Sequence, residues 1–167
     1  MADFQKSVNL YNARGVPGAF ASINPVVSTP LGYIAGEGGV TVGQFCWEDA
    51  ETDGVVVGTG TGKPLGFVVR DLIYPIYDLG GAQNIVPEGF NVNVHVSGDF
   101  YVQVPAAVTK GQKVFVNNTT GALAGGTAGG TVASSTETDW FFATDAEKDG
   151  IAIISNHGNT PAIASGE

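Results

Sequence analysis

The sequence is poor in the side chains that most enzymatic and metal chemistry requires. Its 167 residues include one cysteine, two histidines and one methionine. A single cysteine excludes an internal disulfide and a zinc site built from thiolates. Cys46 stands beside Trp47 in an apolar run, and we expect it to be a small buried side chain rather than a nucleophile.

Charge is also scarce. Charged residues make up 14% of the chain and hydrophobic ones 43%, whereas an average soluble domain has roughly 25% charged residues. The surface is therefore expected to consist of small uncharged side chains, which are easily desolvated against another protein. The net charge of −9 excludes the basic stripe that nucleic-acid binding needs, so nucleic acid is not an expected partner.

Long apolar runs and a basic leader are absent as well. No apolar stretch approaches 18 residues, so we expect neither a membrane-spanning segment nor a classical export signal. A chain of 167 residues is long enough for one domain with a substantial core.

Glycine is abundant, and one glycine-rich stretch raises the question of a phosphate loop. Residues 55–70 read VVVGTGTGKPLGFVVR, which contains the Gly62-Lys63 pair of a Walker motif. Val57 replaces the leading glycine and Pro64 replaces the metal-binding hydroxyl residue. We therefore interpret 55–70 as a β-hairpin with a glycine-rich turn.

Short runs of β-forming residues recur between Gly, Asp and Asn, and no segment has a helical period. Alternation in 91–97 predicts Val92, Val94 and Val96 on one face and His95 on the other. The pattern predicts an all-β protein, an antiparallel β-sandwich or barrel, for which a jelly roll is one arrangement. The expected strands are 40–47, 54–58, 66–70, 91–97, 99–104, 112–117, 139–144 and 150–155.

The chain is predicted to have two parts. Residues 1–30 contain three prolines and scattered apolar side chains without a strand period, which predicts an extended N-terminal arm. Residues 31–167 are predicted to form a single β-rich domain, with a long flexible Gly/Ala/Thr-rich loop at 119–138. Residues 1–36 carry a net charge of +1 (Lys6 and Arg14 against Asp3), and the remaining residues carry −10.

A repeated acidic motif, D-A-E-x-D-G, occurs at 49–54 and 145–150. It resembles the start of a calcium loop, but the twelfth position, which should be Glu, is Gly60 or Asn156. We interpret both copies as solvated hairpin tips in which glycine takes the positive-φ position. Neither calcium nor zinc is expected to be needed, and no cofactor is predicted.

No catalytic motif is present. There is no G-x-S-x-G elbow, and carboxylates are paired only in the two tips, where water would keep their pKa values normal. His95 and His157 lack partners at ligand spacing and are interpreted as surface or interface residues. The protein is therefore not expected to be an enzyme.

The order of the sequence elements resembles a known family. The matching pieces are GVPGAFASINP, GGVTVGQFCWED, KPLGFVVRD, GDFYVQVPAAVTKGQKVFVNNTTGAL and WFFATDAEKDGIAIIS. In this order they are similar to the decoration, or structural cement, proteins of tailed-bacteriophage heads. The resemblance implies a virion protein made in the host cytoplasm. It would bind the outer capsid surface and bridge neighbouring major capsid subunits, usually as a homo-oligomer, a dimer or a trimer.

Two segments provide the expected contacts with the capsid or with other copies. The first is the arm, which we expect to reach a neighbouring subunit, although it could instead lie on its own domain as an edge strand. The second is 71–90, whose apolar side chains either form an interface or fold over their own core. The candidate residues are Phe4, Leu10, Tyr11, Arg14, Phe20, Tyr74, Ile76, Tyr77, Ile85 and Val86.

Two other functions remain open at this point. A carbohydrate- or receptor-binding β-domain of a virion should show clustered exposed Trp and Tyr, but both tryptophans occupy predicted strand positions. A hydrolase on a β scaffold is the third possibility, without a motif to support it.

Overall fold

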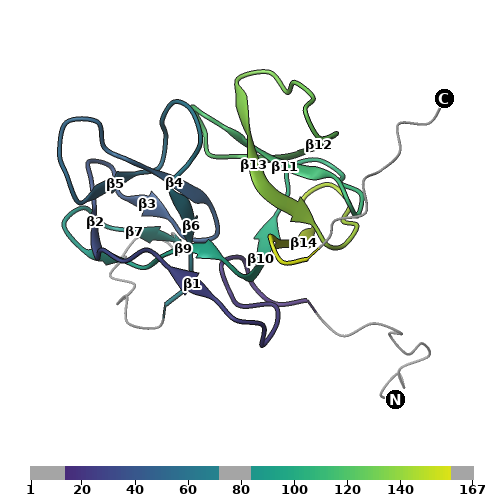
Figure 1. Cartoon of the computed structure of the whole chain (residues 1–167), viewed down its shortest axis with the longest axis horizontal. Helices are drawn as coiled ribbons and strands as arrows, with labels where there is room; N and C mark the ends of the chain where they lie inside the picture. Colours follow the sequence, from purple (N-terminus) through teal and green to yellow (C-terminus); the bar gives the residue numbers. More distant parts are fainter. Residues whose placement is uncertain (1–13, 72–83, 159–167) are drawn as a thin grey trace, which may run out of the picture.

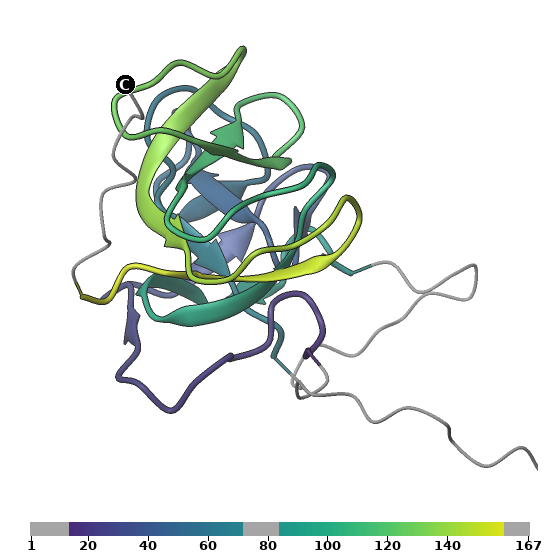
Figure 2. The same cartoon turned by 90° about the vertical axis from the view of Figure 1, so that its right-hand side faces the viewer.

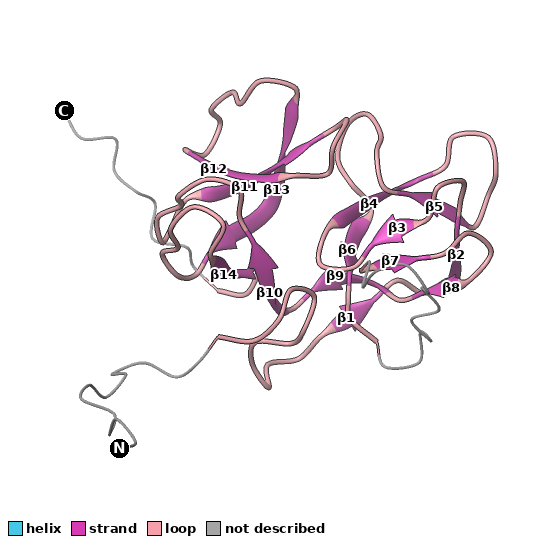
Figure 3. Ribbon diagram, turned by 180° about the vertical axis from the view of Figure 1, so that it is seen from behind, coloured by secondary structure: helices cyan, strands magenta, loops and turns pink. Residues whose placement is uncertain are grey.

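The computed structural model describes residues 14–71 and 84–158. All regular structure in these ranges is β, in fourteen strands (Figure 3). The strands form two main sheets, which lie side by side in Figure 1. The first contains mostly strands from the N-terminal half of the chain, and the second consists of the strands that follow residue 98.

The first sheet has seven short strands of two to four residues. In spatial order they are β1 (Val27–Ser28), β9 (Val94–Ser97), β6 (Gly66–Val68), β4 (Phe45–Glu48), β5 (Val55–Val57), β2 (Tyr33–Ala35) and β8 (Asn91–Val92). A separate two-stranded sheet pairs β3 (Val40–Thr41) with β7 (Ile85–Val86).

The second main sheet has five antiparallel strands, and β13 is the longest at eight residues. In spatial order they are β10 (Asp99–Gln103), β14 (Ile151–Ser155), β13 (Ser135–Phe142), β11 (Lys113–Asn117) and β12 (Leu123–Gly126).

Two hydrophobic cores fill the molecule. The aromatic core lies between the two main sheets and includes Phe45, Phe67, Phe100, Trp140 and Phe142. Phe67 of β6 stacks on Phe100 of β10, with ring centroids 4.8 Å apart. The valine core is formed within residues 33–94 and includes the following buried residues: Tyr33, Ala35, Val40, Cys46, Val56, Val68, Val86, Val92 and Val94.

Strands β4 and β6 contribute to both cores because successive side chains of a strand point to opposite faces. Phe45 and Trp47 of β4 enter the aromatic core, and Cys46 between them enters the valine core. In the same way Phe67 and Val68 of β6 face opposite cores. The two cores are thus separated by one strand layer.

The all-β prediction is confirmed. The described strands form a sandwich of open sheets, not a closed barrel. One pair departs from the antiparallel expectation, since β2 runs parallel to β5.

The hairpin predicted for 55–70 is wrong in its topology. β5 and β6 do not pair, because both pair antiparallel with β4, which lies between them. The glycine-rich connection crosses the Trp47 side chain instead: the indole Nε1 donates to the carbonyl of Gly62 at 3.0 Å. A Cβ on Gly60 would lie 2.5 Å from the Trp47 ring, so the glycine there reflects close packing and not a phosphate site.

The single long loop predicted for 119–138 is also wrong in its secondary structure. It contains β12 and the beginning of β13, both paired with β11. Glycine is required in β12 because a Cβ on Gly126 would lie 2.6 Å from the ring of Phe115. The segment whose composition indicated a loop therefore contains a tightly packed edge strand.

The strand predicted at 91–97 is interrupted at Asn93, between β8 and β9, and the predicted alternation fails at His95 and Val96. Val92 and Val94 are buried as expected, but Val96 is exposed and His95 is buried, with 7% of its surface accessible. The prediction that His95 is a surface residue is wrong, since its face of β9 points toward Phe100.

The part of the predicted arm that the structure describes lies on its own domain. We call residues 14–30 the N-terminal strap. Its residues 18–21 run beside β10, and β1 pairs with β9. In Figure 2 the strap, in purple, follows the underside of the molecule. The described strap therefore corresponds to the edge-strand alternative.

Candidate interaction surface

The described residues contain no arrangement suited to metal or thiol chemistry. Within 14–71 and 84–158, no three His, Cys, Asp or Glu side chains lie together as metal ligands. Burial raises the pKa of Cys46 to about 12, so the thiol stays protonated and is not a nucleophile. No helix that could cross a membrane occurs in the same ranges.

His95 is a packing residue. Burial lowers its pKa below the ordinary value, although the charge of Asp71 opposes the shift. Its ring contacts Phe20 edge-on, with centroids 5.7 Å apart, and its Nδ1 lies 3.4 Å from the hydroxyl of Ser28. A neutral imidazole of this kind anchors the strap to β9 and has no acid-base partner among these contacts.

Both tryptophans are core residues, with 3% of Trp47 and 4% of Trp140 exposed. Neither can serve as a stacking platform for a sugar ring. This finding excludes the tryptophans from the exposed aromatic cluster that the carbohydrate-binding alternative needed.

Four of the predicted contact residues lie in the described part of the chain. The guanidinium of Arg14 donates to the carbonyl of Ile151 at the end of the hairpin after β13. Phe20 is 47% exposed, Ile85 is 40% exposed, and Val86 is fully buried in the valine core. Val86 is therefore a core residue whose side chain is not available to a partner. The other six lie outside the described residues: Phe4, Leu10, Tyr11, Tyr74, Ile76 and Tyr77.

Arg14 and Phe20 lie on the strap, whereas Ile85 lies on β7 in the small two-stranded sheet. The structure thus brings together only the strap candidates.

Exposed apolar side chains concentrate on and just after the strap. Large hydrophobic side chains are exposed at ten described positions, and seven of these fall between residues 16 and 34. The seven are Val16, Phe20, Ile23, Val26, Val27, Leu31 and Ile34. Six of them lie on the strap or directly after it, whereas Ile34 lies on β2, away from β1 in the same sheet. A concentration like that of the six marks a contact surface more often than scattered exposed residues do.

Sequence reasoning selected only Phe20 from these seven. A usable signal was present: residues 15–36 contain no charged side chain, although the chain has a net charge of −9. Apolar residues without a period, in an uncharged segment with prolines, indicate a surface that cannot bury them all locally.

A buried carboxylate fixes the strap to the second sheet. Asp99, 8% exposed, accepts hydrogen bonds at Oδ2 from the hydroxyl of Ser22 and the amide of Asn24, both at 2.6 Å. Burial alone would raise the pKa of Asp99, but hydrogen bonds from Ser155, Ser22 and Asn24 and the charge of His157 together lower it. The ionised carboxylate is therefore the form that holds the strap.

Backbone hydrogen bonds support the same attachment. Gly18 and Ala21 donate to the carbonyls of Tyr101 and Asp99, and Tyr101 donates to the carbonyl of Ala19. Gly18 has φ = +83°, a conformation that glycine adopts without strain. The strap thus extends the second sheet beyond β10 by one irregular strand.

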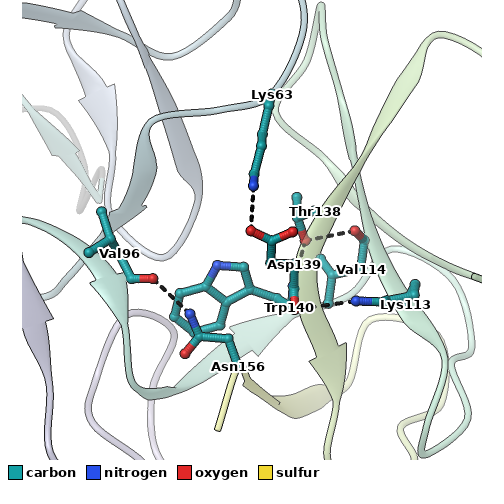
Figure 4. A network of polar contacts seen from close by, with 8 residues as sticks. All are labelled: Lys63, Val96, Lys113, Val114, Thr138, Asp139, Trp140 and Asn156. Atoms are coloured by element: carbon teal, nitrogen blue, oxygen red, sulfur yellow. Dashed lines mark hydrogen bonds and ion pairs between the residues drawn. The ribbon is translucent and has the colours of Figure 1, made fainter. Parts of the chain in front are cut away.

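Polar contacts also hold the two halves together (Figure 4). Lys63, from the connection that crosses Trp47, forms an ion pair with Asp139 of β13. Asn156 donates to the carbonyl of Val96 at 2.7 Å and accepts from the amide of Gly98 at 3.0 Å. The contacts of Asn156 link the first sheet to the second at the point where the chain passes from β9 to β10. The strap is therefore attached to both main sheets, which are themselves joined to each other.

Comparisons with known proteins agree with this picture. Residues 4–156 match the family model described as structural cement protein (E217 gp24/Pam3 gp6). A chain from the solved structure titled "The capsid of Myoviridae Phage XM1" is similar in fold. Its TM-score is 0.61 at 17% sequence identity, over 92% of this chain and 97% of that chain. No curated protein sequence matches significantly.

Proposed function

The chain belongs to the phage structural cement protein family, and from this premise we propose that it binds the outer surface of an assembled capsid and ties neighbouring major capsid subunits together. The family is a structural family of virion proteins and not an enzyme family. The proposal adds the outer surface and the bridging of capsid subunits to this general role.

The observation that carries the proposal is the concentration of exposed, uncharged apolar side chains between residues 16 and 31, on the strap and directly after it. A surface of this kind is stabilised by contact with another protein because desolvating it costs little and removes apolar area from water. A shell presents many identical sites, so contacts that are individually weak act together when one protein bridges two subunits.

We also propose that the protein acts as a homo-oligomer, a dimer or a trimer. Bridging requires at least two attachment points, and a symmetric oligomer supplies identical ones. Tyr74, Ile76, Tyr77 and the residues before Arg14 are further candidates for these contacts.

Co-sedimentation with undecorated phage heads tests the proposed function. We expect saturable binding with a fixed ratio of protein to capsid subunit, and a higher temperature of head disruption when the protein is bound. Heads that already carry the protein are the control and should bind little more. Absence of binding to undecorated heads at micromolar concentration would overturn the proposal. Light scattering of the free protein measures its oligomeric state.

A further inference from the structure

We propose that the turn Ser22–Ile23–Asn24 is a preformed apolar knob that docks into an uncharged apolar hollow of the major capsid protein. The inference rests on the proposed function and names the part of the surface that makes the contact.

Ile23 is the most exposed large apolar side chain described, with a relative accessibility of 104%. Both of its neighbours are held by one atom: Ser22 and Asn24 donate to Oδ2 of Asp99, each at 2.6 Å. The backbone N–H of Asn24 also donates to the hydroxyl of Ser22 at 3.0 Å. The backbone on each side of Ile23 is therefore fixed while its side chain projects into solvent.

An exposed isoleucine without a function would not need a restrained backbone on both sides. A flexible turn could fold over and bring an exposed Ile side chain back onto the protein, but the hydrogen bonds from Ser22 and Asn24 to Asp99 restrain the turn on each side of Ile23. Ordering a contact residue before binding reduces the entropy lost on association, which is how preorganisation raises affinity. A buried carboxylate used to orient an apolar side chain points to a binding contact.

The surroundings of the knob define the chemistry of its partner. Val26 and Val27 of the strap and Val96 of β9 are 42%, 51% and 38% exposed, and β1 pairs with β9. No charged residue occurs between Arg14 and Glu37. The complementary surface is therefore apolar and uncharged, and it is recognised by shape.

A second copy of the chain adding a strand at β1 fits this edge poorly. β1 has two residues, its pairing with β9 is irregular between Val27 and Ser28, and Pro25 and Pro30 flank it. Short length, irregular pairing and proline are devices that block strand addition at a sheet edge. At β1 the strap thus presents side chains and not a backbone edge, which suits docking on a protein of different structure, the capsid subunit.

The test compares three variants with the wild-type protein in binding to undecorated heads. Ile23→Ser removes the knob and is expected to weaken binding at least tenfold. Ile34→Ser is the matched control, because Ile34 is 42% exposed and lies on β2, away from the strap edge of the same sheet; it should change binding less than twofold. The double variant Ser22→Ala/Asn24→Ala keeps Ile23 but releases the turn, and we expect a three- to tenfold loss.

The outcomes separate this inference from the proposed function. If the wild-type protein fails to bind heads, the proposed function is overturned. If it binds and Ile23→Ser binds equally well, the knob is overturned and the proposed function stands. If Ile23→Ser changes the oligomeric state of the free protein in light scattering, the knob contacts a second copy and the capsid assignment is overturned. Circular dichroism and the melting temperature show whether each variant is folded.

Discussion

The aromatic core and the valine core differ in how far apart in the sequence their residues lie. The aromatic core combines Phe45 and Phe67 from the first half with Phe100 and Trp140 from the second half. The valine core is local, since all of its buried residues lie between Tyr33 and Val94. One core therefore joins the two main sheets, and the other stabilises only one of them.

Although the two cores differ in this way, they share two strands, and we therefore expect the molecule to unfold as one cooperative unit. β4 and β6 lie between the cores and contribute side chains to both. A loss of packing in either core changes the position of these two strands and so weakens the other core. We expect a single unfolding transition, in which the aromatic core has the larger share of the free energy.

The largest expected effect is the loss of an aromatic ring from the core between the sheets. Phe100 is fully buried and its ring centroid lies 4.8 Å from Phe67 and 5.7 Å from Trp140. We expect Phe100→Ala to lower the free energy of unfolding by about 3–5 kcal/mol, because both sheets lose packing. Urea denaturation measures the change.

Phe90→Ala is the control for this prediction, because Phe90 is 43% exposed and should cost less than about 1 kcal/mol. A cost below about 1.5 kcal/mol for Phe100→Ala would contradict the importance of the aromatic core.

A smaller effect is expected from the valine core. Val56 is fully buried, and Val56→Ala removes two methyl groups at about 0.8 kcal/mol each, with a cavity cost in addition. We expect a loss of about 2 kcal/mol and an unchanged dependence on urea concentration. Two separate transitions in this variant would show that the cores unfold independently.

The third prediction concerns the carboxylate that attaches the strap beside the aromatic core. Asp99→Asn is expected to lower the free energy of unfolding by about 1–2 kcal/mol at pH 7, because hydrogen bonds to a charged group are lost. The pKa of Asp99 is lower in the folded protein than in the unfolded chain. Its contribution is therefore complete above a pH of about 4 and is lost as the pH falls through the folded pKa.

Urea denaturation of the wild type and the Asp99→Asn variant between pH 7 and pH 2.5 tests this sign. The difference between the two proteins should shrink with acidification. A difference that stays constant or grows in acid would contradict the assignment of the ionised form.

The smallest changes in stability are expected at the two acidic tips, one from each half of the chain. Asp145 Oδ1 accepts a hydrogen bond from the amide of Lys110 at 2.8 Å, so Asp145→Ala should cost about 0.5–1 kcal/mol. Asp49, at the equivalent position of the other copy, has no such contact among the hydrogen bonds of the described residues, and Asp49→Ala should change stability by less than about 0.5 kcal/mol. Melting temperatures of both variants check the order; equal shifts would contradict it.

The tips also show what a sequence motif can and cannot predict. Both copies of D-A-E-x-D-G connect neighbouring strands as predicted, and Gly54 has φ = +76°. In the second copy the positive φ belongs to Asp149, at +61°, and not to Gly150. The second tip is attached to residues 104–110, where Ala146 bridges Val108 and the amide of Asp149 donates to Val104. Tertiary contacts therefore decided the local conformation.

The dependence of short strands on tertiary contacts also explains which strands could be predicted from the sequence. Strands β10, β11 and β14 are five residues long and carry their own β-forming pattern, so the sequence predicted them closely. The strands of the first sheet have two to four residues, too few to show a period, and β1, β2, β7 and β12 were not predicted. The connection from β5 to β6 packs against the ring of Trp47, a contact between distant residues that no local pattern contains.

The exposed apolar side chains of the strap were anticipated from the sequence only in part. The first thirty residues were identified as the contact segment, and Phe20 was among the residues selected, but Ile23 was not. The exposure of Ile23 depends on Asp99, which lies 77 positions from Ser22 in the sequence, and a local pattern carries no information about so distant a partner.

That separation also has a consequence for synthesis. The strap leaves the ribosome before the residues that hold it, Asp99 and Tyr101, have been made. At roughly 5–20 residues per second, the 77 positions between Ser22 and Asp99 correspond to about 4–15 seconds of translation. During this interval an uncharged apolar segment waits in the nascent chain without its partners. The strap is therefore made well before the residues on which it docks.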